Sequence, residues 1–307
     1  MRHTTNPTLD RRFFLKTAAW LGKTTAASSL LSPALSMLGA AERSEARAPT
    51  YEPLVQPSEL HSVSGFLDAT ITAAPGPVQL GDRIFPGMLY NGSYVPPTLR
   101  ACLGDTLRIA FHNVSPRGNS DNVFVHVHPG ETFQYEVRIP ASGRQGPGLF
   151  WYHPHAHGYV NDQILGGMSG ALVVDGIEEL YPLLLGLPER FLLIKHAKLA
   201  DDSEIVSING QINPSIAMRP GEMQFWRIAH IGASLFIKFS IEGMPLYVMG
   251  TDGHPLSQPR KISEFLIGPG ERIEAIAVGP PPGEYAMRTI SFQNEAWRPP
   301  KRRGIWH

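Results

Sequence analysis

A short turn signal recurs along the chain and limits what it can fold into. Pro129-Gly130-Glu131, Pro220-Gly221-Glu222 and Pro269-Gly270-Glu271 each precede an apolar segment, and Leu103-Gly104-Asp105 is a degenerate fourth copy. Proline presets φ at one central turn position, and glycine permits a positive φ at the next. Each half of the chain carries two such turns, which indicates an internal repeat and two domains.

The segments that follow these turns have the periodicity of strands. Apolar and polar residues alternate over residues 107–111, 133–139 and 235–241, so each segment is expected to bury one face. Residues 171–174 and 191–194 are short continuous apolar runs, as in the inner strands of a sandwich. We therefore predict an all-β chain with two tandem Greek-key β-sandwiches, at residues 50–176 and 185–290.

The spacing of the turns differs between the two halves. Gly221 and Gly270 are 49 residues apart, whereas Gly104 and Gly130 are 26 residues apart. If the halves share a fold, the first half is about 23 residues shorter, and the shortfall lies near residues 113–121. A sheet edge that a complete repeat would cover is expected to be exposed there or covered by the loop.

The N-terminal 48 residues have the layout of an export signal. Arg11 and Arg12 precede Phe13-Phe14-Leu15-Lys16, and an uncharged stretch from Thr24 to Ala41 follows. This resembles a twin-arginine signal, with Asp10 in place of the usual hydroxyl residue. We expect cleavage between Gly39 and Ala48, export to the periplasm, and no membrane span in the mature chain.

Composition excludes several classes of function. Lys+Arg and Asp+Glu both number 27, so no basic excess indicates a nucleic-acid partner. The single cysteine rules out an internal disulfide and any site built from several thiolates.

The most informative segment holds three histidines at a spacing of two. His153, His155 and His157 follow Trp151-Tyr152 directly. On a strand, side chains at i and i+2 point to one face, so His153 and His155 can present two imidazoles together. Imidazole suits copper, zinc, iron and nickel, and divalent copper binds most tightly among these in general. A polar sheet edge with incidental histidines is the alternative.

With its surrounding motifs, this segment resembles the multicopper oxidases. The resemblance covers about residues 80–290 and includes these motifs: residues 151–155, 163–174, 97–100, 104–107, 129–132, 208–211, 219–222, 226–228, 251–253 and 269–272. It implies cupredoxin-like domains and copper as the cofactor. It also implies that His153 and His155 correspond to ligands of the trinuclear cluster that reduces dioxygen, with electrons supplied by a reductant.

The chain also departs from the family pattern. The family has an earlier His-x-His-Gly in its first domain, where the turn spacing places the shortfall. His126 and His128 flank Val127 but adjoin the Pro129 turn, and we interpret them as a solvent-facing pair. The third domain of the family, with its blue copper and His-Cys-His bridge, has no counterpart here, and residues 291–307 form an irregular tail.

The remaining histidines and the cysteine have no ligand partner at strand spacing. Cys102 has Ala101 and Leu103 as neighbours and is expected to be a strand or turn residue rather than a ligand. His112 is expected at the surface, and His230 and His254 are interpreted as structural. His230 stands where the family usually has Asn.

Three functional interpretations remain open. The first is an exported, copper-binding oxidoreductase of the multicopper oxidase family, incomplete as a single chain and in need of a third-domain partner or a homo-oligomer. The second is a copper-poor cupredoxin-fold scaffold or binding protein. The third is a simple periplasmic copper binder that uses His153, His155 and His157. We expect no laccase-type oxidase activity from the isolated chain.

Overall fold

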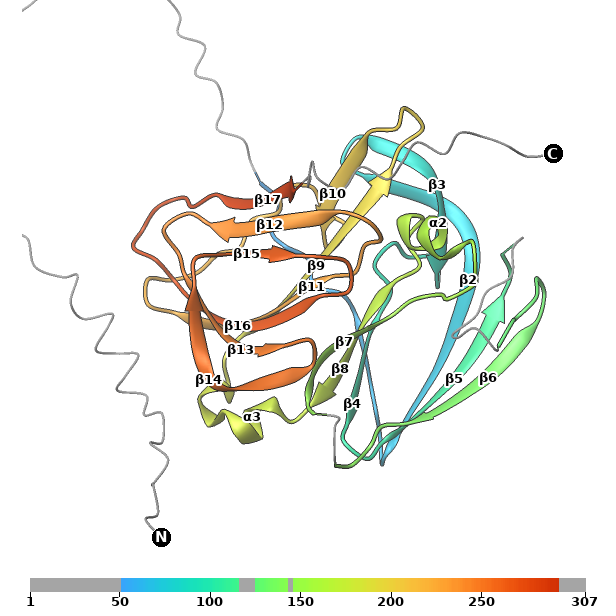
Figure 1. Cartoon of the computed structure of the whole chain (residues 1–307), viewed down its shortest axis with the longest axis horizontal. Helices are drawn as coiled ribbons and strands as arrows, with labels where there is room; N and C mark the ends of the chain where they lie inside the picture. The colour runs from blue at the N-terminus through green and yellow to red at the C-terminus, as the bar shows by residue number, and fades with distance from the viewer. Residues whose placement is uncertain (1–50, 116–124, 143–145, 293–307) are drawn as a thin grey trace, which may run out of the picture. The chain divides into compact units, whose positions relative to one another are not determined.

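The computed structural model describes residues 51–115, 125–142 and 146–292, and the regular secondary structure of these residues is almost entirely β-strand (Figure 1). The predicted signal segment, the centre of the predicted shortfall and the tail from residue 293 onward lie outside these residues. In the described part of the chain, no helix is long and apolar enough to cross a membrane.

The first sandwich consists of two four-stranded sheets, and strands from both contribute to one apolar core. One sheet has the order β1-β4-β8-β7 and the other has the order β3-β2-β5-β6. The strands are β1 (Glu59–His61), β2 (Phe66–Leu80), β3 (Arg83–Tyr90), β4 (Thr98–Cys102), β5 (Thr106–Asn113), β6 (Thr132–Arg138), β7 (Gly148–Tyr152) and β8 (Gly170–Asp175). A short helix, α2 (Val160–Leu165), connects β7 to β8.

The second sandwich has a six-stranded sheet and a three-stranded sheet. Their orders are β10-β9-β11-β16-β13-β14 and β15-β12-β17. The strands are β9 (Glu189–Lys198), β10 (Glu204–Ile208), β11 (Met223–His230), β12 (Phe236–Ile241), β13 (Leu246–Thr251), β14 (His254–Ile262), β15 (Glu264–Ile267), β16 (Arg272–Val278) and β17 (Met287–Phe292). The short helices α3 (Ile177–Leu180) and η2 (Pro182–Leu184) connect the two sandwiches. The all-β prediction of two tandem cupredoxin-like sandwiches is confirmed.

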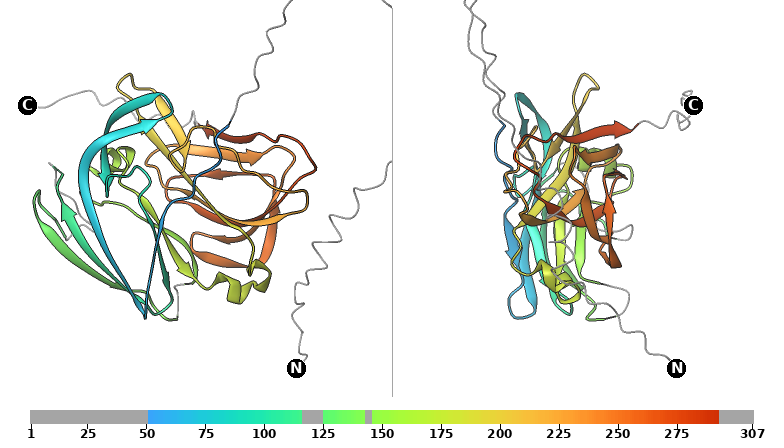
Figure 2. Two further views of the ribbon diagram at one scale, coloured as in Figure 1. Left: turned by 180° about the vertical axis from the view of Figure 1, so that it is seen from behind. Right: turned by 90° about the vertical axis from the view of Figure 1, so that its left-hand side faces the viewer.

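One sheet of each sandwich contains the same four-stranded unit. β3-β2-β5-β6 and β10-β9-β11-β16 agree in strand order, and the central pairs β2–β5 and β9–β11 are both parallel. The last pairs, β5–β6 and β11–β16, are both antiparallel. Figure 2 shows the two sandwiches from behind and from one side.

The recurrent turn starts both strands of each antiparallel pair. Gly104, Gly130, Gly221 and Gly270 have φ of 92°, 84°, 75° and 84°, a region that favours glycine. In each turn the last residue accepts, through its carboxylate, a hydrogen bond from the backbone N–H three residues earlier, as Glu131 Oε2 does from His128 at 2.8 Å. The glycine N–H also donates to the end of the partner strand, for example from Gly130 to the Asn113 carbonyl at 2.7 Å.

Among the described residues, only the second sandwich has strands between the two strands of its repeated pair, and these strands account for the predicted shortfall. β12, β13, β14 and β15 all lie between β11 and β16 in the sequence, and β13 and β14 extend the sheet beyond β16. In the first sandwich the described residues between β5 and β6 contain no strand. The sheet therefore ends at β6 within the described residues.

The alternation over residues 133–139 predicted one buried face for β6, and this part of the prediction is wrong. β6 forms as expected, but Phe133 is 39% exposed and Val137 is 47% exposed. The physical reason is the missing cover. Its counterpart β16 has a strand on each side and buries its central residues, whereas β6 pairs with β5 alone among the described residues.

Candidate functional site

The histidine segment begins where β7 ends. β7 closes at Tyr152, so His153 and His155 lie in the irregular segment after the strand rather than on it as predicted. The His153 ring stacks on the Trp151 indole, with a centroid separation of 3.9 Å and an interplanar angle of 25°. This stacking fixes the first imidazole against the end of the strand.

The structure brings His153 and His155 together. Their ring centroids are 4.2 Å apart at an interplanar angle of 43°. His153 is half-buried, whereas the side chain of His155 is exposed, and His157 is also exposed. The half-buried imidazole of His153, stacked on Trp151, and the exposed imidazole of His155 therefore lie side by side at the surface.

The electrostatics keep His153 in its neutral form. Burial, followed by the neighbouring His155, lowers its pKa from 6.5 to about 4. His153 Nδ1 lies 3.0 Å from the Pro154 carbonyl oxygen. Since a carbonyl can only accept, Nδ1 carries the proton and Nε2 keeps its lone pair. A backbone partner of this kind orients a ligating histidine in many metal sites.

The donor set therefore fits copper in part. Neutral imidazoles are the form that binds metal, and copper accepts them well. Among the residues that the structure describes, no three His, Cys, Asp or Glu side chains gather as a metal site. Two imidazoles at the end of one strand are thus a partial ligand set.

A turn of the second sandwich supports the site from behind. A Cβ built on Gly270 would lie 3.1 Å from Trp151 Cζ2, so the glycine of this turn allows the indole to pack closely. Similarly, a Cβ on Gly253 would lie 2.2 Å from Phe150 Cζ. Two glycines of the second sandwich thus accommodate the aromatic residues that lead to His153.

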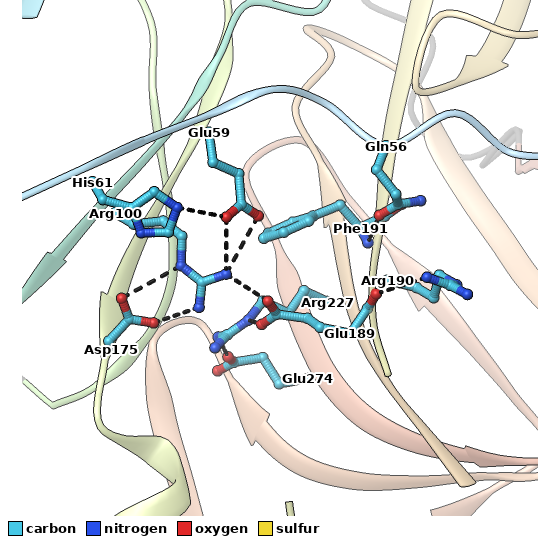
Figure 3. Close-up of polar contacts among 10 residues, drawn as sticks. All are labelled: Gln56, Glu59, His61, Arg100, Asp175, Glu189, Arg190, Phe191, Arg227 and Glu274. Atoms are coloured by element: carbon cyan, nitrogen blue, oxygen red, sulfur yellow. Dashed lines mark hydrogen bonds and ion pairs between the residues drawn. The ribbon is translucent and has the colours of Figure 1, made fainter. Parts of the chain in front are cut away.

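A network of ion pairs, half-buried at Arg100 and Glu189 and buried at Arg227, joins the two sandwiches (Figure 3). Arg100 on β4 binds Asp175 on β8 at 2.5 Å and Glu189 on β9 at 2.5 Å. Glu189 also binds Arg227, which in turn binds Glu274. Glu189 therefore bridges an arginine of each sandwich.

Two carboxylates of this network, Glu189 and Glu274, differ in their electrostatic surroundings. Burial acts to raise the pKa of Glu189, but Arg227 and Arg100 outweigh it, so the pKa lies below its ordinary value. Burial raises the pKa of Glu274, which is 1% exposed, above its ordinary value despite the Arg227 charge. Arg227 is therefore the group that compensates a deeply buried carboxyl.

A buried lysine makes a second connection between the sandwiches. Lys195 on β9 donates to the carbonyls of Gly167 at 2.8 Å and Ser169 at 3.1 Å, and also to that of Tyr94. Burial holds its pKa well below the ordinary value. Together with the ion network, this lysine holds the first sandwich, and hence the end of β7, against the second.

A second histidine pair lies in the first sandwich. The rings of His126 and His128 are 4.6 Å apart, and both side chains are exposed while Val127 between them is buried. This agrees with the interpretation of a solvent-facing pair. The pair also offers a matched comparison for His153 and His155.

The cysteine and the remaining histidines considered in the sequence analysis make only local contacts or are exposed. Cys102 is exposed at the end of β4, and burial followed by the nearby Asp105 raises its pKa. His112 is half-buried and lies 2.7 Å from Thr132 Oγ1 through Nδ1. His254 is exposed, with Nδ1 3.0 Å from the Asp252 carbonyl.

The sequence patterns missed His196 altogether. His196 on β9 and His230 on β11 are both fully buried, with ring centroids 5.9 Å apart. Burial lowers the pKa of each to about 4. The sequence did contain a signal: Lys195 and His196 directly continue the apolar run at residues 191–194. A polar residue that continues a buried strand is expected to be buried as well.

The chain matches models of a known protein family over most of its described residues. Two family models described as Multicopper oxidase match it, one over residues 151–307 and the other over residues 118–179. Relatives include Multicopper oxidase MmcO of Mycobacterium tuberculosis, 25% identical over 68% of this chain and 51% of its own length. Cell division protein FtsP of Yersinia pestis is 23% identical over 61% of this chain and 45% of its own. The chain spans about half the length of the curated relatives it matches.

Solved structures share the fold. The multicopper oxidase from Campylobacter jejuni, described as a metallo-oxidase, matches with a TM-score of 0.68 and 22% identity, covering 80% of this chain and 58% of its own. The laccase-like multicopper oxidase CueO from Ochrobactrum sp. matches with a TM-score of 0.68 and 20% identity. At these identities the likeness establishes the fold alone.

Proposed function

The chain belongs to the multicopper oxidase family, and on that premise we propose that it is an exported protein that binds copper at His153 and His155. The observation that carries the proposal is the 4.2 Å separation of the two rings, with His153 neutral and its Nε2 lone pair available. Bound copper supplies one-electron redox chemistry.

The residues around the two imidazoles have separate tasks. Trp151 stacks on His153 and sets the plane of its ring, and the Pro154 carbonyl selects the tautomer. Burial of His153 keeps Nε2 unprotonated at neutral pH, so protons compete weakly with a metal for this atom. His155 supplies the accessible imidazole.

Copper titration of the purified chain, followed by calorimetry and electron paramagnetic resonance, tests the site. The double variant His153→Ala/His155→Ala should remove most copper uptake. His126→Ala/His128→Ala is the matched control, since these two rings are also close together but are both exposed, without the partial burial of His153. Loss of uptake in the control variant, with retention in the first variant, would contradict the proposal.

Dioxygen reduction by this family demands more than two imidazoles. We propose that the chain acts together with a polypeptide that supplies a cysteine flanked by histidines, because the neighbours of Cys102 are Ala101 and Leu103 rather than histidines. The copper-loaded chain alone should show no thiolate charge-transfer band and no oxygen uptake with a phenolic reductant. A blue band or sustained oxygen consumption would overturn this.

We also propose that the protein is exported through the twin-arginine pathway and binds copper outside the cytoplasm. Arg11 and Arg12 precede an uncharged stretch in the layout of a twin-arginine signal, and the proposed mature domains begin near residue 50. Replacing both arginines with lysine should leave full-length precursor in the cytoplasm. Periplasmic appearance of that variant at normal levels would contradict a twin-arginine route.

A copper-poor scaffold is the second candidate function. Two observations favour it: the match to a cell division protein, and the absence of a third ligating side chain beside the pair in the described residues. The same titration separates the candidates, because a scaffold should purify without copper and take up none at His153.

A further inference from the structure

Arg272, the first residue of β16, ties β7 to the turn that precedes β16. Its Nε donates to the Leu149 carbonyl at 3.1 Å, and its Nη1 donates to the Gly270 carbonyl. The guanidinium group is planar and rigid, so two carbonyls bound to one such group have a fixed relative position. A strand of the first sandwich and a turn of the second are thus joined through one side chain that is 15% exposed.

The turn held in this way is the one on which the Trp151 indole packs. Gly270 has a φ of 84°, and a Cβ built there would lie 3.1 Å from Trp151 Cζ2 and 3.5 Å from Trp151 Nε1. The same indole stacks on the His153 ring, with the two centroids 3.9 Å apart. Any movement of the turn relative to β7 therefore moves the support of the His153 imidazole.

Asp252 fixes the arginine itself. Asp252 Oδ1 accepts a hydrogen bond from the Arg272 backbone N–H at 3.0 Å and lies 3.3 Å from Arg272 Nη1, and the Asp252 N–H donates to the Arg272 carbonyl at 2.9 Å. The next residue, Gly253, packs against Phe150, because a Cβ there would lie 2.2 Å from Phe150 Cζ. The guanidinium therefore has a defined place before any metal binds, as preorganisation of a site requires.

We propose that Arg272 is a positioning residue for the pair His153 and His155: it holds β7 against the Gly270 turn and so fixes the indole on which His153 stacks. The inference rests on the proposed copper site and adds to it a residue that acts through Trp151. Ligands that must be ordered on binding lose affinity. Residues that support metal ligands change metal affinity by about 10- to 100-fold, and about tenfold is expected for one that acts through a further side chain.

Nuclear magnetic resonance of the copper-free full chain gives the first test, because it does not depend on the metal. Ring protons stacked on an indole resonate upfield, and His153→Gln identifies the His153 signals by their loss. Arg272→Gln should move these signals toward the position of an exposed histidine, since the carbonyls of Leu149 and Gly270 lose their common donor. Signals that stay at the wild-type position would overturn the proposal.

Arg219→Gln is the matched control. Arg219 also adjoins a Pro-Gly-Glu turn of the second sandwich and lies 3.2 Å from Glu222, but its side chain is 89% exposed. This variant should leave the His153 signals and the copper affinity unchanged. A shift as large as that of Arg272→Gln would show that the signals report a general loosening of the second sandwich, which contradicts a specific role for Arg272.

Copper titration by calorimetry gives the second test. Arg272→Gln should weaken copper binding by about tenfold. Arg272→Lys keeps the charge beside Asp252 but lacks the planar fork, so it should recover little of the affinity or of the His153 shift. Full recovery by lysine would mean that the charge alone is needed, and the positioning role would then be wrong.

Failure of this inference can be told apart from failure of the copper site. If the wild-type chain takes up no copper but Arg272→Gln moves the His153 signals, the proposed function is wrong and the positioning role stands. Wild-type copper uptake with unmoved signals in Arg272→Gln means the reverse.

A second variant carries the test if circular dichroism shows that Arg272→Gln does not fold. Asp252→Asn keeps an acceptor for the Arg272 N–H but removes the ion pair with the guanidinium. It should move the His153 signals in the same direction and by a smaller amount. Unmoved signals in this variant overturn the proposal.

Discussion

The strand pairs β5–β6 and β11–β16 begin with the same turn and end in different surroundings. Both pairs have a glycine with positive φ, a carboxylate cap and a closing hydrogen bond from that glycine to the end of the partner strand. β16 is nevertheless buried between two neighbours, while β6 is exposed at an edge within the described residues. Local turn chemistry thus specifies which strands pair, and burial depends on what the intervening chain supplies.

One aligned position of the two pairs shows how different residues meet the same need. Asn113 ends β5, and its Oδ1 accepts a hydrogen bond from the N–H two residues later at 3.2 Å. His230 ends β11, and its Nδ1 accepts from the Gly232 N–H at 3.2 Å. His230 therefore makes the hydrogen bond that Asn113 makes in the first sandwich, which agrees with the prediction that His230 is a structural residue.

The two positions differ in their remaining polar atom. Asn113 Nδ2 donates to the Val127 carbonyl at 2.8 Å. His230 Nε2 and His196 Nδ1 are buried without a hydrogen-bond partner in the described structure. At this position the first sandwich satisfies its buried polar atom, whereas the second leaves one without a partner among the described residues.

The largest expected effect comes from breaking the buried charge pair of the second sandwich. Arg227→Met leaves Glu274 buried and without its charge partner, which should lower the free energy of unfolding by about 3–5 kcal/mol. Arg108→Met in the first sandwich removes an exposed pair with Asp68 and should cost less than about 1 kcal/mol. Urea denaturation measures both, and equal losses would contradict the contrast in burial.

Acid sensitivity should come next, and two of the three described histidines whose pKa burial lowers to about 4 lie in the second sandwich. His196 and His230 have pKa values of about 4 when folded, below the ordinary 6.5, so the unfolded chain takes up protons first as the pH falls. Their contribution to the free energy of unfolding is complete above pH 6.5 and is lost as the pH falls toward 4.

The variant His230→Asn gives the second sandwich the residue that the first one has. It removes one titrating imidazole, so the free energy of unfolding should fall less steeply between pH 6.5 and 4. Urea denaturation at several pH values measures this slope. An unchanged slope would mean that His230 does not contribute to the acid sensitivity.

The smallest effect concerns the shared turns themselves. Glu271→Ala removes the acceptor for the Gly268 N–H, a half-buried bond of 2.6 Å, and should cost about 1–2 kcal/mol. Glu131→Ala removes the equivalent exposed bond and should cost less than about 1 kcal/mol. Glutamine at either position keeps an acceptor and should recover most of the loss. Equal costs at both turns would show that burial does not matter there.

Much of the fold could be predicted because its signals are local. The alternating segments, the turns and the shorter first half depend on residues a few positions apart. The proximity of His153 and His155 was also predicted from their spacing, although the strand ends before them. The exposure of β6 was not predicted by its periodicity, since alternation records which residues share a face and not whether another layer covers it.

The contacts that hold the two sandwiches together could not be read from spacing. Arg100 meets Glu189 across 89 positions, and Lys195 reaches carbonyls 26, 28 and 101 positions away. The short-range pattern gives a signal for Lys195, which continues the apolar run at residues 191–194, but it does not distinguish Arg100 from a solvated arginine.

The strands, their turns and the histidine pair follow from local sequence, because φ preferences and side-chain alternation act within a few residues. The assembled layers decide which charges are buried, which imidazoles have a lowered pKa and, among the described residues, how far each strand is covered. Those outcomes depend on desolvation and on pairing between distant segments, and both are properties of the assembled layers.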